Sequence, residues 1–304
     1  MDEVRIWSPA TIANLNVGFD ALGCALERPG EETWLKATSE KGVVRITEIH
    51  GMELDARRNV AAVAAESLLN AIGAPCGIEM VLHKSIKPGS GIGSSASSAA
   101  AAVVGVNELL QAGLRWDELL PFALDGEFIA SGARHADNVA PALRGGLVLC
   151  PPEGTPMSIP VPTGLHLVVL HPQVQVQTML ARTVLPSDVP FQSAIDQSRW
   201  LGAFIASCFE NQTDRAVFAM EDLLVTSHRK HLIPLFEDVK SAAFSRGARA
   251  GGIAGSGPST FWVCRDESSS IEVETAVSQV MRDSSIEFFV YRTGISPIGA
   301  HRIA

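Results

Sequence analysis

A loop rich in glycine and serine carries the clearest chemistry in the sequence. It runs from Pro88 to Ser98 (PGSGIGSSASS), after a strand-like segment and into a helix-like one. Gly89, Gly91 and Gly93 let the backbone approach a ligand closely and turn its N–H groups toward it. The helix that follows adds unsatisfied N–H groups and the positive end of its dipole. The pattern therefore predicts an anion site, and a di- or triphosphate is the natural guest.

Two lysines, Lys84 and Lys87, precede the loop and bring positive charge to it. On its own, the pattern also fits a plain glycine turn followed by a helix that a serine caps. Other phosphate loops fit less well. A P-loop ends in Lys followed by Ser or Thr, and a dinucleotide fold needs a second strand with an acidic residue about 20 residues on. The sequence also lacks the larger motif set of protein kinases.

Hydrophobic periodicity predicts the elements that must hold the loop in place. Segments 4–7, 33–38, 43–49 and 78–86 alternate like strands, and segments 59–71, 94–112 and 117–131 have helical spacing. The helix over 94–112 is rich in alanine and meets Gly113 at its end. Farther along, the pattern predicts strands over 165–171, 260–264 and 287–292, helices over 192–210, 213–230, 234–246 and 270–282, and a glycine-rich turn over 251–257.

A change in composition divides the chain in two. Residues 151–164 (PPEGTPMSIPVPTG) are rich in proline, which disfavours a sustained helix and predicts irregular chain or a short edge strand. Strands and helices are interspersed on both sides of this segment, which favours an α+β fold. We therefore expect two domains, residues 1–155 and residues 156–304.

Charge and composition exclude several classes of function. A net charge of −9 over 304 residues gives no basic footprint for nucleic acid, and no apolar run is long enough to span a membrane. The first residues (MDEVRIWSPA) lack the pattern of a secretory signal. Scattered cysteines without a CxxC pair favour reduced thiols. The sequence therefore predicts a cytoplasmic protein without nucleic-acid or membrane partners.

Four motifs in order give the sequence a family resemblance. The loop PGSGIGSSASS resembles the central motif of the GHMP kinases, the family of galactokinase, homoserine kinase, mevalonate kinase and phosphomevalonate kinase. Segment 9–20 (PATIANLNVGFD) resembles the first motif in its homoserine-kinase form, and segment 251–258 (GGIAGSGP) resembles the third. Segment 135–141 (HADNVAP), followed by Gly145 and Gly146, is similar to the homoserine-kinase branch in particular.

The resemblance implies a two-domain GHMP kinase fold with a nucleotide site. An N-terminal domain like domain 2 of ribosomal protein S5 would face a ferredoxin-like C-terminal domain across the active-site cleft. Mg²⁺ would bind through Ser95 and Glu127. Without the resemblance, Ser95 could be a helix cap, Glu127 a solvated charge and Asn59 the cap of its helix. The residues implied for ATP are Asn59, Lys84, Lys87, Pro88, Gly89, Ser90, Gly91, Ile92, Gly93, Ser94, Ser95, Ala96, Ser97 and Ser98.

The resemblance also implies a substrate, L-homoserine, whose side-chain hydroxyl would be phosphorylated to O-phospho-L-homoserine in threonine biosynthesis. Arg182 and Arg229 would bind its carboxylate, since an arginine fork matches that group, and Asp20 and Asp137 would bind its ammonium. As isolated residues, each would more often form a surface ion pair or a turn. The remaining residues implied for the substrate are Asn14, His135, Asn138, Gly255, Ser256 and Gly257.

Asn138 distinguishes this sequence within the family. It stands eleven residues after Glu127, where the mevalonate and galactose branches carry an aspartate thought to act as a base. Asparagine cannot take up a proton, so we expect Ser95, Glu127 and Asn138 to act in catalysis without a strong side-chain base. Two alternatives stay open: another small-molecule kinase of the family, and a non-catalytic sensor that binds ATP and a metabolite. A homodimer is expected by family analogy alone.

Overall fold

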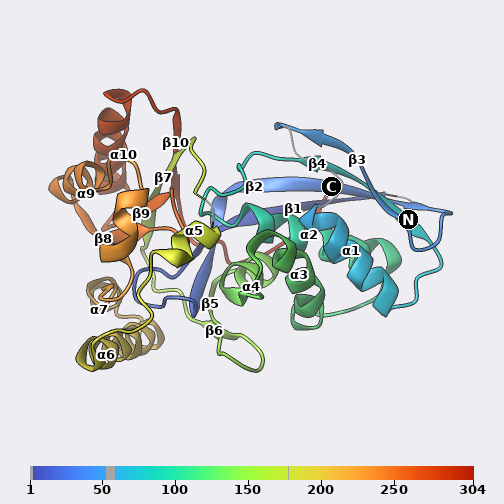
Figure 1. Cartoon of the computed structure of the whole chain (residues 1–304), viewed down its shortest axis with the longest axis horizontal. Helices are drawn as coiled ribbons and strands as arrows, with labels where there is room; N and C mark the ends of the chain where they lie inside the picture. The colour runs from blue at the N-terminus through green and yellow to red at the C-terminus, as the bar shows by residue number, and fades with distance from the viewer. Residues whose placement is uncertain (1–2, 53–58, 177) are drawn as a thin grey trace.

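The computed structural model describes residues 3–52, 59–176 and 178–304, which form two α+β domains side by side (Figure 1). In the larger domain, helices cover one face of a long, twisted sheet. In the smaller domain, helices pack around a second sheet. Both ends of the chain lie in the larger domain. No helix in these three ranges is long and apolar enough to cross a membrane.

The larger domain is built on a mixed sheet whose strands follow the order β11-β1-β2-β4-β3, with β5 paired with β2 and β6 paired with β5. β3 and β4 are parallel, and the other neighbouring strands are antiparallel. The strands are β1 (Glu3–Ala13), β2 (Leu22–Thr38), β3 (Val44–His50), β4 (Gly77–His83), β5 (Leu147–Leu149), β6 (Met157–Ile159) and β11 (His301–Ile303). The helices are α1 (Val60–Ala71), α2 (Ser94–Leu110), α3 (Trp116–Ser131) and α4 (Ala136–Arg144).

The smaller domain holds an antiparallel sheet in the order β10-β7-β9-β8. With helices between β7 and β8 and again between β9 and β10, this is the ferredoxin-like arrangement expected from the resemblance. The strands are β7 (His166–Pro172), β8 (Ala248–Ile253), β9 (Thr260–Cys264) and β10 (Phe288–Thr293). The helices are α5 (Thr178–Thr183), α6 (Phe191–Phe209), α7 (Thr213–Phe218), α8 (Thr226–Arg229), the 3₁₀ turn η2 (Lys230–Leu232), α9 (Phe236–Ser245) and α10 (Glu267–Arg282).

The predicted domain division at residues 155 and 156 stays a prediction, but the sheets add a detail to it. β6 pairs with β5, and the last strand, β11, pairs with β1, so two segments beyond residue 155 belong to the larger sheet. The chain therefore leaves the larger domain after β6 and returns to it only at its end. The smaller domain is an insertion between these two strands.

Several elements differ from the sequence prediction. β1 and β2 are far longer than segments 4–7 and 33–38, because a register irregularity between Pro9 and Thr11 lets the pairing continue past the proline. The helix predicted over 213–230 is interrupted, since the Asp222 carboxylate accepts N–H groups of Leu224, Val225 and Thr226 and turns the chain. The short elements α4, β5, α5, β8 and β11 were not predicted. The turn predicted over 251–257 starts later than expected, because residues 251–253 pair with β9 and belong to β8.

α2 begins and ends differently from the prediction. Its N-cap is Gly93, a residue without a side chain to cap the helix, rather than a serine. It ends at Leu110 instead of Ala112, because the Asn107 side chain exchanges two hydrogen bonds with the backbone of Leu114 and draws the chain away. The first-turn N–H groups of α2 therefore receive no hydrogen bond from a capping side chain.

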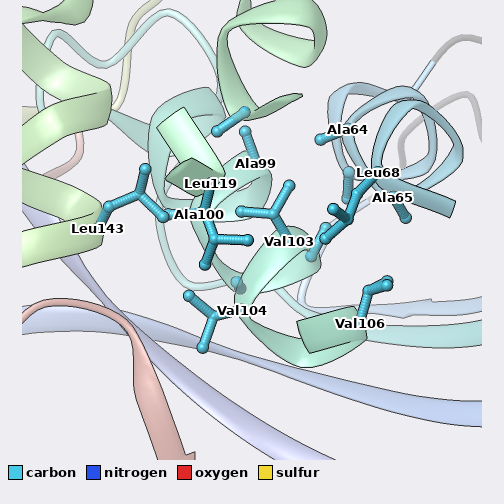
Figure 2. Close-up of a cluster of buried hydrophobic side chains, with 14 of the residues drawn as sticks. Ala64, Ala65, Leu68, Ala99, Ala100, Val103, Val104, Val106, Leu119 and Leu143 are labelled. Carbon is cyan, nitrogen blue, oxygen red and sulfur yellow. The ribbon is translucent and has the colours of Figure 1, made fainter. Parts of the chain in front are cut away.

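The core of the larger domain is packed around α2 (Figure 2). Ala99, Ala100 and Val103 are fully buried and lie among side chains of α1, α3 and α4. Alanine occupies many of these positions, so the helices approach closely and little space remains for a larger side chain. The same helix that starts at the glycine-rich loop is thus held firmly by its neighbours.

This packing predicts that Ala100→Leu is destabilising. Alanine and leucine have similar helix propensities, so the cost of about 1–3 kcal/mol in unfolding free energy should come from overpacking. Urea unfolding measures it. The matched control is Ala203→Leu on the exposed side of α6, where we expect little change. Equal stability of the two variants would contradict the packing described here.

Candidate active site

A cavity of about 390 Å³ lies between the two domains and is lined by both. The larger domain contributes the end of β1, the glycine-rich loop, α3 and α4. The smaller domain contributes α5, α8 and the turn between β8 and β9. The lining residues are Ala13, Asn14, Phe19, Asp20, Pro88, Gly89, Ser90, Gly91, Gly93, Ser94, Ser95, Glu127, Ala130, His135, Asp137, Asn138, Gln175, Met179, Arg182, Arg229, Gly255 and Ser256.

The loop expected to bind phosphate forms one wall of this cavity. Gly89, Gly91 and Gly93 have φ angles of 72°, 82° and 70°, a left-handed conformation that favours glycine. Gly91 is also required by space, since a Cβ there would lie 2.5 Å from the carbonyl oxygen of Ala254 and 2.7 Å from that of Gly257. The glycine-rich turn of the smaller domain therefore packs directly against the loop.

A buried ion pair lies beneath the start of α2. The Lys84 ammonium pairs with the Glu31 carboxylate of β2, and it donates 2.8 Å hydrogen bonds to the hydroxyls of Ser94 and Ser98. The other Glu31 oxygen accepts the N–H of Ile86 at 2.9 Å. Burial raises the pKa of Glu31, and the nearby ammonium opposes that shift. The pair thus joins β2, the end of β4 and the first turn of α2.

Lys84 therefore does not line the cavity, although the sequence placed it among the ATP residues. Its side chain is 4% exposed and fully engaged below the loop. The side chains of Ile92, Ala96, Ser97 and Ser98 also point into the protein. Lys87 is exposed outside the cavity, and Gly257, whose carbonyl oxygen packs against Gly91, is not among the lining residues. The predicted ATP contacts of the two lysines, Ile92, Ala96, Ser97 and Ser98 stay predictions, and so does the predicted substrate contact of Gly257.

Asn59 is the cap of its helix, which was the alternative to an ATP contact that the sequence left open. Its side chain caps α1 by accepting the N–H of Ala61 at 2.9 Å. It does not line the cavity. Its predicted contact with ATP is untested, but the capping bond already engages the side-chain oxygen.

Ser95 and Glu127 come together where the loop meets α3. Glu127 is 9% exposed, and burial raises the pKa of its carboxyl to about 7, opposed by a hydrogen bond from Ser95. Both residues line the cavity. Ser95 therefore does not act as a plain helix cap, and Glu127 is not a solvated helix charge.

Asp137 and Asp20 form an acidic pair in the wall of the cavity. Asp137, in the first turn of α4, is 4% exposed, and burial followed by the charge of Asp20 raises the pKa of its carboxyl to about 7. Asp20 accepts a 2.7 Å hydrogen bond from Arg182 of α5. His135 stands beside them, half-buried, with its pKa lowered by burial and by the Arg182 charge. The structure thus brings these four predicted residues together.

Arg229 is the second guanidinium of the site and is 2% exposed. Its Nε donates to the carbonyl oxygen of Ala181 at 2.7 Å, and its Nη1 donates to that of Gly255 at 3.2 Å. Burial and the neighbouring charge of Arg182 lower its pKa. A buried arginine with donors toward a cavity is suited to a carboxylate or a phosphate.

Two asparagines form hydrogen bonds between different segments of the site. Asn138 accepts a 2.7 Å hydrogen bond from the hydroxyl of Thr11, which leaves its amide N–H₂ as the donor side. Asn14 donates to the carbonyl oxygen of Gly255 at 3.0 Å and accepts the N–H of Asp20 at the same distance. Asn14 and Asp20 have positive φ angles of 74° and 55°, so this turn is held in a conformation that few side chains adopt unaided.

Some residues of the site were missed by sequence reasoning. Phe19, which lines the cavity, and Thr11, which hydrogen-bonds to the lining residue Asn138, lie within segment 9–20, so the motif pointed to their neighbourhood without giving them a role. Gln175 packs against Gly89, and Met179 follows on α5. No pattern in the sequence singles out these two, because their positions depend on how the smaller domain meets the loop.

The fold and the cavity together define a two-domain α+β protein with a phosphate-type loop at the domain interface. Residues 59–146 match the family described as "GHMP kinases N terminal domain", and residues 201–283 match "GHMP kinases C terminal". A homoserine kinase from Chlorobium phaeobacteroides is 38% identical over 93% of this chain and 92% of its own length. One from Natronomonas pharaonis is 35% identical over 96% and 97%. The chain belongs to the GHMP kinase family.

Solved structures agree with this assignment. The crystal structure of a homoserine kinase from Cytophaga hutchinsonii has a TM-score of 0.94 and 37% identity, covering 100% of this chain and 98% of that one. A mevalonate kinase from L. major, solved with R-mevalonate, has a TM-score of 0.71 at 16% identity over 96% of both chains, which shows the shared fold. The predicted family and fold class are confirmed.

The ion pair beneath α2 predicts different roles for the two lysines before the loop. Lys84→Met should lower the free energy of unfolding by about 3–5 kcal/mol, because Glu31 would be left buried without its partner. Lys87→Met, on the exposed loop, is the control and should change stability by less than about 0.5 kcal/mol. Urea unfolding of both variants provides the comparison. Similar stabilities would show that Lys84 is not a structural residue.

Asp137 predicts a pH dependence of stability. Its pKa in the folded protein is about 7, above its ordinary 3.8, so the folded state keeps a proton that the unfolded chain releases. Stability from this group is present at low pH and lost as pH rises toward 7. Asp137→Asn should therefore raise the thermal midpoint more at pH 8 than at pH 5.

The matched control is Asp238→Asn, an exposed aspartate in the first turn of α9. Its effect on the midpoint should differ little between the two pH values. A midpoint for Asp137→Asn that stays at a constant offset from the parent protein would contradict the raised pKa.

Proposed function

We propose that this protein is a homoserine kinase, which transfers the terminal phosphoryl group of ATP to the side-chain hydroxyl of L-homoserine. The product would be O-phospho-L-homoserine, an intermediate of threonine biosynthesis. The observation that carries the proposal is a single cavity lined both by a phosphate-type loop and by Asp20, Asp137, Arg182 and Arg229. The full-length similarity to homoserine kinases supports it.

These four charged residues match the substrate's chemistry. L-Homoserine carries a carboxylate, which the guanidinium groups of Arg182 and Arg229 would bind, and an ammonium, which Asp20 and Asp137 would bind. Mevalonate has a carboxylate but no ammonium, and galactose has neither. Two carboxyl groups placed opposite two guanidinium groups therefore favour an amino acid over either alternative substrate. The Asp20–Arg182 pair would separate to take up the two charges of one ligand.

Ser95 and Glu127 fit a magnesium ion. Mg²⁺ binds hard oxygen ligands and is often held by one or two protein oxygens together with substrate phosphates and water. The two residues offer a hydroxyl and a carboxylate that lie within hydrogen-bonding distance at the start of α2. The pKa of Glu127 is raised because burial disfavours its charged form, and a bound cation would favour that form again. When bound, the ion supplies charge neutralisation at the phosphates.

The remaining residues would position the reactants. The first turn of α2 and the loop glycines would direct backbone N–H groups at the phosphates, where they stabilise the charge of the transition state. Asn138, oriented by Thr11, would donate its amide N–H to the substrate hydroxyl and set its direction of attack. The asparagine cannot remove a proton, so the hydroxyl proton would leave late and pass to the phosphoryl group. Positioning and electrostatics would then account for most of the catalysis.

ADP release tests the proposal. With L-homoserine, release should rise far above the background without substrate, and mevalonate and galactose should stay near that background. No release above background with homoserine would refute the proposed function. Release with mevalonate or galactose instead would favour a sister kinase. Binding of ATP without any turnover would favour a sensor. A homodimer remains a prediction of the family analogy, and a cytoplasmic location remains a prediction from the sequence pattern.

The proposed magnesium ligands predict large losses of turnover. Ser95→Ala and Glu127→Gln should each lower kcat at least about 100-fold, which corresponds to roughly 3 kcal/mol of transition-state stabilisation. Matched controls are Ser97→Ala, whose hydroxyl donates to the Ser8 carbonyl away from the cavity, and Glu118→Gln on the exposed side of α3. Steady-state kinetics at saturating Mg²⁺ and ATP measures the change. Rates near normal would remove Ser95 and Glu127 from the site.

A further inference from the structure

The ring of Phe19 lies against both guanidinium groups of the cavity. The Cζ atom of Arg229 is 5.0 Å from the ring centroid, and that of Arg182 is 5.8 Å away. Both distances are within the range in which a cation is attracted to the negative face of an aromatic ring. Phe19 itself lines the cavity and is half-buried, so it stands in the site rather than behind it.

The two arginines need such a contact because their charges repel. Arg182 is paired with Asp20 at 2.7 Å, while the hydrogen bonds of Arg229 to protein atoms are made to two neutral carbonyl oxygens. A third carboxylate beside them would balance the charge, but it would also occupy N–H donors. An aromatic face attracts a guanidinium without using any of its five N–H donors. The ring therefore leaves the donor edges available to a ligand.

The backbone around Phe19 is fixed on both sides. Gly18 donates its N–H to the carbonyl oxygen of Asn14 at 2.9 Å, and Asp20 donates its N–H to the Asn14 side chain at 3.0 Å. The Asn14 amide in turn holds Gly255, whose carbonyl oxygen also accepts from Arg229. One turn of β1's exit loop thus connects the ring, the acidic residue and the buried arginine.

We propose that Phe19 is a positioning residue that holds Arg182 and Arg229 side by side with their donor edges open to the carboxylate of the acceptor alcohol. This inference rests on the proposed function, since it concerns how that substrate is recognised. The ring then sets a preference for alcohols that carry a carboxylate over those that do not. The ring does not affect how the nucleotide binds.

Phe19→Leu tests the role of the ring, because leucine keeps an apolar side chain of similar bulk without a π face. The KM for L-homoserine should rise about tenfold, while the KM for ATP stays within about twofold. Phe19→Tyr, which keeps the face, should regain most of the lost affinity. With 3-aminopropan-1-ol, which lacks the carboxylate, kcat/KM should be the same in Phe19→Leu and the parent protein.

An unchanged homoserine KM in Phe19→Leu would overturn the inference, and so would equal losses with both alcohols or with ATP. If the parent protein does not turn over 3-aminopropan-1-ol, two other results decide. They are a rise in the KM for L-homoserine without a rise in the KM for ATP, and the recovery of homoserine affinity in Phe19→Tyr. Failure of the proposed function is seen separately, as no homoserine turnover in the parent protein. Calorimetric binding of L-2-aminobutyrate then decides: weaker binding to Phe19→Leu supports the role of the ring, and equal or undetectable binding to both proteins overturns it.

Discussion

The buried pair of Glu31 and Lys84 is the interaction on which the site depends. Neither charge reaches water, so each must be satisfied by the other and by groups fixed around them. Those groups are the backbone after β4 and two serines in the first two turns of α2. A helix start that would otherwise be free to shift is thereby held against the sheet. The loop can then present its N–H groups from one position only.

The second constraint is the close contact of backbone with backbone across the domain interface. Gly91 faces the carbonyl oxygens of Ala254 and Gly257, the N–H of Ser259 donates to the carbonyl oxygen of Ser90, and Gly255 is held by Asn14. The glycines of the two segments are therefore required for the close contact between the domains as well as for the approach of a ligand. The cavity is lined by polar residues of both domains because each domain contributes its motifs to the same interface.

The sequence was sufficient for the local features and insufficient for the distant ones. Glycines at alternate positions followed by an alanine-rich helix predicted the loop and the helix that it opens. Lys84 was placed with the ATP because it is near the loop in sequence, yet the direction of its side chain is decided by Glu31, 53 residues earlier. Asn59 caps α1, as the structural alternative in the sequence analysis had it, because asparagine directly before a helix can accept a first-turn N–H. Thr11, Phe19 and Gln175 acquire their roles only where separate elements meet.

The pairing of β11 with β1 affects how the protein is made. During synthesis the chain emerges from its N-terminus, and domains tend to fold as they appear. Here the edge of the first sheet at β1 stays open until β11 has been made, after the smaller domain. Until then the larger domain carries an exposed strand edge, which is a hazard for pairing with other chains. Pairing of β11 with β1 removes that edge and joins the segment after the smaller domain to the first sheet.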